Sequence, residues 1–396
     1  MRTSSVPALL AALSLPIYAD ATESPDDSGA ALTIEAAYTG EAWRNVAGGV
    51  RRDGTYLENI DLIATLDAER AFGWTGTTFL VSGLHNNDST LSDRIVGDIQ
   101  TVSNIDTDGA TRLYEAWVER AFDAGAVKVG LIDLNSELDV NETGALFINS
   151  SHGIGPDFSQ VGENGPSIFP ITGLGAVMRW DYSERVQARI AAFEGTVGDP
   201  DRPHRTTLDL EGGEGALLAA ELTFRPSEAS RYLLGVWRHT GRSADFADEE
   251  LQHRTESLGV YGIAEGTLLK SGERSLNGFV RLGVADADVH QVSRYVGAGV
   301  VWSGPLLASA EREEQLGLAV ATITNGSSFR RAQAQLDSTF ERHETAIELT
   351  YRVQALSWLA LQPDVQYVIN PGTDPALEDA WVVGLRFELS WSKEAG

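Results

Sequence analysis

Segments in which apolar and polar residues alternate recur along the chain from residue 32 to residue 391, and the last, DAWVVGLRFELSW, is the clearest. One face of that segment carries Trp381, Val383, Leu385, Phe387, Leu389 and Trp391, and the other carries Val382, Gly384, Arg386, Glu388 and Ser390. Alternation with period two predicts β-strands that separate an apolar environment from a polar one. A soluble β-sandwich and a transmembrane β-barrel with a watery lumen both satisfy this pattern.

The spacing of the alternating segments distinguishes these two folds. Sixteen strands are predicted, most of them of the roughly 9–11 residues that cross a bilayer at a tilt. They start near Leu32, Tyr56, Thr77, Leu113, Val127, Gly173, Val186, Gly215, Tyr232, Ser257, Leu276, Tyr295, Gln315, Thr345, Leu359 and Asp379. Short connections, such as 123–126 and 270–275, alternate with long ones, such as 86–112 and 134–172. This parity predicts an all-β fold, a transmembrane antiparallel β-barrel of about 16 strands with termini in the periplasm.

The N-terminus has the features of a secretory signal peptide. Arg2 precedes an apolar stretch at 6–18, and Ala19-Asp20-Ala21 forms a small-x-small cleavage site. Cleavage after Ala19 or Ala21 is predicted, so that residues 1–21 are the signal peptide and residues 22–396 form the barrel domain. The chain contains no cysteine and carries a formal charge of −27. It therefore has no disulfide framework, and the acidic balance argues against a nucleic-acid partner.

The longest connection, 134–172, is predicted to narrow the lumen. A barrel of sixteen strands encloses a space too wide for side chains alone to fill. The part of this connection with the sequence NSSHGIGPDFSQVGENGPSIFP is rich in glycine and proline, but it also contains apolar residues that a solvated surface loop would not need. We expect a loop folded inward as a constriction, with a disordered surface loop as the alternative. The constriction-loop candidates are Asp133, Asn135, Glu137, Asn149, His152, Phe158 and Phe169.

Several segments resemble the carbohydrate-selective porins of Gram-negative outer membranes, the OprB-like family. The segments are GLIDLNSELDVNETGALFINSSHGIGP, NIDLIATLDAERAFGWTGTTFLVSG, VGDIQTVSNI, RLYEAWVERAF, QPDVQYVINPG and WVVGLRFELSW, in the family's order. The resemblance implies an outer-membrane porin that passes sugars by passive diffusion through a channel narrowed by inward-folded loops. Ala116, Val118 and Arg120 depart from the family's usual residues and leave the solute preference open. The partners that the resemblance implies are mono- or oligosaccharide solutes, outer-membrane lipid and lipopolysaccharide.

Charged residues of both signs are predicted on the lumen face of the strands. Alternation places there Arg179, Arg189, Glu221, Arg281, Glu348, Arg352, Arg386 and Glu388. Guanidinium groups and carboxylates can exchange hydrogen bonds with the hydroxyls of a sugar, so these residues are candidates for lining the pore. The alternative is that they form ion pairs that are merely solvated in the channel.

No catalytic residue, cofactor or metal site is predicted. The run of oxygen-bearing residues from Asp133 to Asp139 lacks the glycine and the distal glutamate of an EF-hand loop. It leaves calcium as an open question and solvated acids as the default. No metalloprotease, nucleophile-elbow or phosphate-loop motif occurs in a suitable context. The alternatives to a porin are a soluble periplasmic carbohydrate-binding β protein and an outer-membrane hydrolase. The oligomeric state is not predicted.

Overall fold

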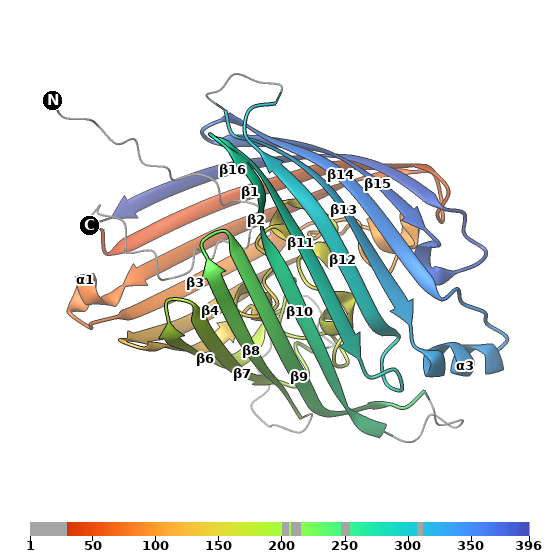
Figure 1. The fold of residues 1–396 in the computed structure, drawn as a ribbon, viewed down its shortest axis with the longest axis horizontal. Helices are drawn as coiled ribbons and strands as arrows, with labels where there is room; N and C mark the ends of the chain where they lie inside the picture. Colours follow the sequence, from red (N-terminus) through yellow and green to blue (C-terminus); the bar gives the residue numbers. More distant parts are fainter. Residues whose placement is uncertain (1–29, 200–205, 207–214, 247–253, 307–311, 396) are drawn as a thin grey trace.

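The computed structural model describes residues 30–199, 206, 215–246, 254–306 and 312–395. The predicted signal peptide lies outside these residues. The described chain forms a closed barrel of sixteen strands (Figure 1). The strands are β1 (Leu32–Ala47), β2 (Gly54–Asp67), β3 (Thr77–Asn86), β4 (Ala110–Phe122), β5 (Gly125–Ile132), β6 (Gly173–Ser183), β7 (Val186–Glu194), β8 (Ala216–Ser227), β9 (Ser230–Ala244), β10 (Arg254–Ser271), β11 (Arg274–Ala285), β12 (Val292–Ser303), β13 (Glu314–Asn325), β14 (His343–Leu356), β15 (Leu359–Ile369) and β16 (Ala380–Ala395).

Each strand pairs in antiparallel fashion with its neighbours in sequence, and β1 closes the barrel against β16. Tyr38 at the seam lies opposite Ile60 on β2 and Leu389 on β16. Closure gives every strand a hydrogen-bonding partner on both sides, so that no sheet edge remains. The predicted fold and strand count are confirmed, and each predicted strand start lies within three residues of the observed one.

The longest connections lie at one end of the barrel, and the shortest turns lie at the other. One end, named here the short-turn end, carries the turns 123–124, 184–185, 228–229, 272–273 and 357–358. The connection with α1 (Ala68–Phe72), the start of β1 and the end of β16 also lie at this end (Figure 1). The opposite end, named the long-loop end, carries the segments 87–109, 133–172 and 326–342, the last with α3 (Ser327–Gln335). This is the arrangement that the alternation of short and long connections predicts.

The two faces of the strands differ in burial as the alternation predicts. On β14 the side chain of Leu349 is 49% exposed on the outer face, and those of its neighbours Glu348 and Thr350 are fully buried inside. The same alternation holds on β16, where Leu385 is exposed and Arg386 is buried. An apolar exterior with a polar interior is the reverse of a soluble protein and suits a barrel in lipid.

Short helical segments lie within the long connections. They are η1 (Leu91–Val96), η2 (Leu134–Ser136), η3 (Gly144–Leu146), η4 (Ser150–His152), α2 (Pro156–Ser159) and η5 (Pro371–Thr373). None of the helices in the described ranges is long and apolar enough to cross a membrane. Four of these segments, η2 to η4 and α2, belong to the connection 133–172 that occupies the lumen.

A channel narrowed by two inward-folded loops

The constriction loop, residues 133–172, leaves the barrel wall well short of the long-loop end. β5 ends at Ile132, which is paired with Gly173 at the start of β6. The neighbouring strand β4 begins at Ala110, whereas its pairing with β5 extends only to Ala116 opposite Leu131. The loop therefore starts partway down the wall, and its first residues already face the lumen. Irregular backbone at membrane depth is tolerated where protein or water surrounds it.

Glutamates of the wall hold the constriction loop by its backbone. Four of them, on β4, β8, β10 and β14, accept hydrogen bonds from N–H groups of the loop. The bonds run to Glu115 from Asp133, to Glu221 from Asp139, to Glu265 from Glu142 and Thr143, and to Glu348 from Ile148 and Asn149, with N···O distances of 2.6–3.3 Å. A loop inside a barrel has few backbone partners of its own, and carboxylates are strong acceptors for its N–H groups.

Arg281 of β11 fastens two separate parts of the loop. Its guanidinium pairs with the Asp139 carboxylate at 2.5 and 2.8 Å and with Asp157 Oδ1 at 2.6 Å. All three side chains are fully buried. A planar guanidinium with five donors can serve two carboxylates at once, which an ammonium group does less well. Arg281 is thus an anchor of the loop and does not line an open channel.

Aromatic contacts hold the same loop against the wall. Phe158 of α2 stacks on Trp237 with a ring-centroid distance of 5.6 Å and on Tyr261 at 5.4 Å. Phe147 packs against Phe279 at 6.0 Å. Glycines on the strands make room for these approaches: a Cβ added at Gly317 would collide with the Phe147 ring. The loop therefore fits a recess that the wall provides.

A second inward loop, residues 87–109, reinforces the first. Its backbone N–H groups at Ile99 and Gln100 donate to the Glu344 carboxylate of β14 at 2.9–3.1 Å. The two loops also bond to each other, since Asn104 N–H donates to the Ile148 carbonyl at 2.9 Å. The sequence marks this segment as long, and the family resemblance implies more than one inward loop, but no residue pattern singles it out.

The two loops leave a cavity of about 480 Å³, the main cavity, beside the wall formed by β1 to β4 and β16. Amides, hydroxyls and carboxylates share the lining with aliphatic side chains such as Ile63 and Ile154 and with three aromatic rings, those of Tyr114, Phe147 and Phe169. The polar members include Asn59, Asp61, Ser82, Gln100, Asn104, Asp106, Asp133, Asn135, Asn141, Ser150, Gln160, Arg386 and Glu388. Tyr114 and Phe169 meet edge to face at a centroid distance of 6.4 Å. The cavity therefore offers both hydrogen-bonding groups and apolar surface, the latter including aromatic rings.

The predicted site residues divide into those that line this cavity and those that support it. Asp133, Asn135, Phe169, Arg386 and Glu388 line the cavity. Buried supports of the loop or wall are Asn149, His152, Phe158, Glu221, Arg281, Glu348 and Arg352, and Glu137 is a partly buried support that bonds to Lys128. Arg179 pairs with Asp181 at 3.3 Å, and Arg189 lies 3.6 Å from Glu137. Most of the inward arginines are engaged by carboxylates, as the ion-pair alternative expects, and contact of any of them with a solute stays a prediction.

The ion-pair partners explain why so many charges fit inside the barrel. Arg352 pairs with Glu388 at 2.9 Å, and Arg386 pairs with Glu41. Lys128 bonds to Glu137 of the constriction loop. Charges removed from water are costly unless they are paired and hydrogen-bonded. The acids of the run from Asp133 to Asp139, which the sequence left open as calcium ligands, bond to different partners. Asp133 bonds to Tyr114, Glu137 to Lys128 and Asp139 to Arg281.

Burial sets the protonation of two constriction-loop residues. It lowers the pKa of the His152 imidazole to about 3, so this ring is neutral at physiological pH and packs against Phe147 at 5.0 Å. Burial raises the pKa of the Asp133 carboxyl to about 6, although the Tyr114 hydroxyl donates to it at 2.5 Å and opposes the shift. His152 is therefore a packing residue, whereas Asp133 is a lining charge that changes near neutral pH.

A closed antiparallel barrel with an apolar exterior and a polar lumen narrowed by its own loops defines the porin class. Residues 51–391 match the carbohydrate-selective porins of the OprB family, and the chain belongs to that family. It is an outer-membrane channel of a Gram-negative bacterium rather than an enzyme fold. These assignments agree with the resemblance seen in the sequence.

Individual relatives support the assignment. The chain is 25% identical to Porin B of Pseudomonas aeruginosa over 89% of this chain and 86% of that protein. It is 22% identical to the putative porin QuiX of Acinetobacter baylyi over 89% and 87% of the two chains. A high-pH structure of OprB from Pseudomonas putida has the same fold, with a TM-score of 0.81 and 21% identity over 91% of this chain and 94% of that one.

The lipid-facing surface leads to a prediction about stability. Arginine at Leu349, which lies mid-strand on the outer face of β14, is expected to lower the free energy of unfolding by about 2–4 kcal/mol if the site lies near the bilayer midplane. Arginine at Leu356, exposed on the same strand beside a short turn, should cost about 0–1 kcal/mol because the head groups and water lie near. Denaturant unfolding in lipid vesicles measures both. Equal losses at the two depths would contradict the placement of β14 across the membrane.

Proposed function

We propose that neutral sugars diffuse through the main cavity of this chain, entering from the long-loop end at the cell surface and leaving at the short-turn end in the periplasm. In this orientation both termini of the mature chain lie in the periplasm, and residues 1–21 serve as the export signal. The lining of the main cavity carries this proposal. Its amides, hydroxyls and charged groups provide both donors and acceptors in a cavity of about 480 Å³, which can hold a small solute.

The aromatic pair in the lining adds a feature suited to sugars. Tyr114 and Phe169 line the cavity next to Asp133 and Asn135. A sugar ring has an apolar C–H face and a rim of hydroxyls, so aromatic rings beside hydrogen-bonding groups match both parts. The affinity of the main cavity for a sugar is expected to be low, because the contacts are spread out and accessible to water. A low affinity suits a channel, since conduction requires sites that release the solute. No catalytic role is proposed for any residue.

Liposome swelling tests this function directly. Vesicles containing the purified protein are placed in isosmotic solutions of sugars of increasing size, and the initial swelling rates are compared. We expect rapid swelling with pentoses and hexoses and a steep fall for longer oligosaccharides. Saturation of monosaccharide flux at high concentration would reflect sites in the channel. Swelling that is equally fast for sugars and for amino acids of the same size would contradict carbohydrate selectivity.

The lining charges predict a weak, pH-dependent preference for cations. Asp61, Asp106, Asp133 and Glu388 outnumber Arg386 in the main cavity. Because the pKa of Asp133 is raised to about 6, its negative charge is present above that pH and lost below it. The permeability ratio of K⁺ to Cl⁻ is therefore expected to fall as the pH drops from 8 to 5. Reversal potentials in a KCl gradient measure it, and Asp133→Asn should shrink the change. A ratio independent of pH would refute the assignment of Asp133 to the conducting path.

A further inference from the structure

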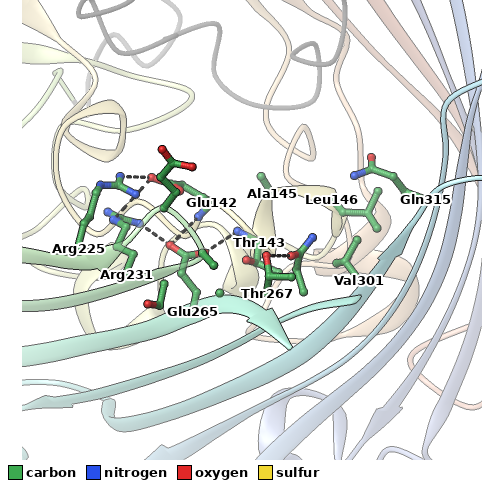
Figure 2. A pocket seen from close by; sticks show the side chains of 15 residues that line it. Glu142, Thr143, Ala145, Leu146, Arg225, Arg231, Glu265, Thr267, Val301 and Gln315 are labelled. Carbon is green, nitrogen blue, oxygen red and sulfur yellow. Dashed lines mark hydrogen bonds and ion pairs between the residues drawn. The ribbon is translucent and has the colours of Figure 1, made fainter. Parts of the chain in front are cut away.

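A second cavity of about 310 Å³ lies near the short-turn end, and we name it the short-turn pocket (Figure 2). One side is the tip of the constriction loop, residues 142–146, and the others are the β8–β9 turn and the inner faces of β10 to β13. Ala145 lines both this pocket and the main cavity. The loop tip thus lies between the two cavities.

One wall of the short-turn pocket is charged, and both of its arginines are paired with carboxylates, while the exposed Glu228 adds a third acid to the lining. Arg225 Nη2 lies 2.5 Å from Glu142 Oε1, and Arg231 Nη1 lies 2.5 Å from Glu265 Oε1 (Figure 2). Glu265 also accepts the Thr143 N–H at 2.7 Å, which fixes the loop tip to the wall. Because each guanidinium already faces a carboxylate, this wall offers oriented donors and acceptors and no uncompensated positive charge for an anion.

Next to this wall, the rest of the lining is neutral and partly apolar. Leu146 and Val301 provide a small apolar surface, with Thr143, Thr267 and Gln315 near them (Figure 2). Thr267 Oγ1 donates to Asn277 Oδ1 at 2.8 Å, which leaves the hydroxyl oxygen of Thr267 free to accept a further bond. Among the described residues, the side chains of Thr143 and Gln315 have no hydrogen-bond partner in the protein. The short-turn pocket therefore holds polar groups that are available for hydrogen bonds to a bound solute.

We propose that the short-turn pocket is a second binding site for a neutral sugar, which a solute occupies after the main cavity and before release. This inference rests on the proposed function. The volume is at the small end of the range of ligand sites, about 300–1,000 Å³, and suits one monosaccharide ring. Hydroxyl, amide and ion-paired groups of the lining match the rim of hydroxyls, and the apolar surface matches a C–H face. A second weak site at the exit assists conduction, because a solute that moves between several weak sites is not held tightly at any one of them.

Protection of a single thiol tests occupancy of the short-turn pocket. The chain contains no cysteine, so each introduced thiol is unique. Ala229→Cys places one on the lining, in the β8–β9 turn, and Glu273→Cys places a control thiol in the exposed β10–β11 turn at the same end. The probe is a small methanethiosulfonate reagent, applied with and without D-glucose. We expect glucose to slow modification of Ala229→Cys several-fold and to leave Glu273→Cys unchanged.

A second pair of variants tests the chemistry of the neutral part of the lining. Thr267→Val with Asn277→Leu, in the Ala229→Cys background, removes polar atoms from the lining but leaves the ion pairs in place. About tenfold more glucose should then be needed for half-protection, because a hydrogen bond contributes roughly 0.5–1.5 kcal/mol and two donors or acceptors are lost. Thr65→Val is the matched control. Thr65 shares the inner face of β2 with Asp61 and Ile63 of the main cavity but does not line either cavity.

The outcomes separate this proposal from the proposed function. If glucose swells liposomes but does not protect Ala229→Cys, the second site is excluded and sugar diffusion stands. The same holds if protection occurs equally at Glu273→Cys. If glucose neither permeates nor protects, the proposed function fails, and the second site fails with it. The protection experiment uses only a conservative change in a turn, so it remains decisive even if the double variant does not fold.

Discussion

A barrel whose constriction loop is replaced by a short Gly/Ser bridge between Asp133 and Thr172 is expected to pass much larger oligosaccharides than the intact protein. Ile132 and Gly173 are paired neighbours on β5 and β6, so a hairpin can close there without moving a strand. The loop fills the space beside the main cavity, and selectivity follows the width and lining of the pore. The size cutoff in liposome swelling should rise, and discrimination among monosaccharides should fall.

The wall should survive this deletion. The sixteen strands are joined to each other around a closed ring, and none of these pairings runs through the loop. Wall charges such as Glu348 and Lys128 lose their loop partners, but water then enters the widened lumen and solvates them. A matched control shortens the connection 326–342, which holds α3 at the same end of the barrel. If the cutoff is the same after either deletion, the constriction loop does not limit the pore.

The sequence predicts the wall of this protein well because the relevant signal is local. Strand positions follow from period-two alternation, and the apolar face of β14 can be recognised from residues such as Leu349 without knowing any partner strand. The length of the connection 133–172 is also visible in the sequence. Its inward course follows from physical constraints, since a wide lumen and a long, partly apolar loop fit together.

The function of the lumen charges could not be predicted in the same way. Alternation shows that Arg281 points inward, but its partners Asp139 and Asp157 lie 142 and 124 residues away in the chain. An inward-facing side chain can lie either in a water-filled channel or against an inward-folded loop, and alternation does not distinguish the two. Glycine on the inner face of a strand is the sequence signal that could have indicated where the constriction loop contacts the wall. A Cβ at Gly283 would collide with the Asp157 carboxylate, so the wall is recessed where the loop enters.

Removing the Arg281 guanidinium is expected to release the constriction loop from the wall. In Arg281→Met the carboxylates of Asp139 and Asp157 remain fully buried without their cation. Breaking a buried pair from one side typically costs about 3–5 kcal/mol, because the remaining charge is uncompensated. The loop can avoid this cost by moving its acids into the lumen water, while the closed strands stay in place. Single-channel recordings should therefore show a larger and noisier conductance, and liposomes should admit larger sugars.

Two further variants distinguish release of the loop from a general loss of stability. Arg238→Met on β9 removes an arginine whose pair with Glu256 is about half exposed, and such pairs contribute only about 0–1 kcal/mol, so conductance should not change. In Arg281→Met/Asp139→Asn/Asp157→Asn the two acids that would lose their cation are neutral as well. The loop then gains no charge solvation by moving into the lumen water. No uncompensated charge then remains buried, and it is that charge which makes breaking a buried pair from one side costly. The triple variant should thus recover a lower, quieter conductance than Arg281→Met alone. If Arg281→Met conducts like the intact protein, Phe158 and the wall glutamates are sufficient to hold the loop. The ion pairs of Arg281 with Asp139 and Asp157 are then not required to keep it in place.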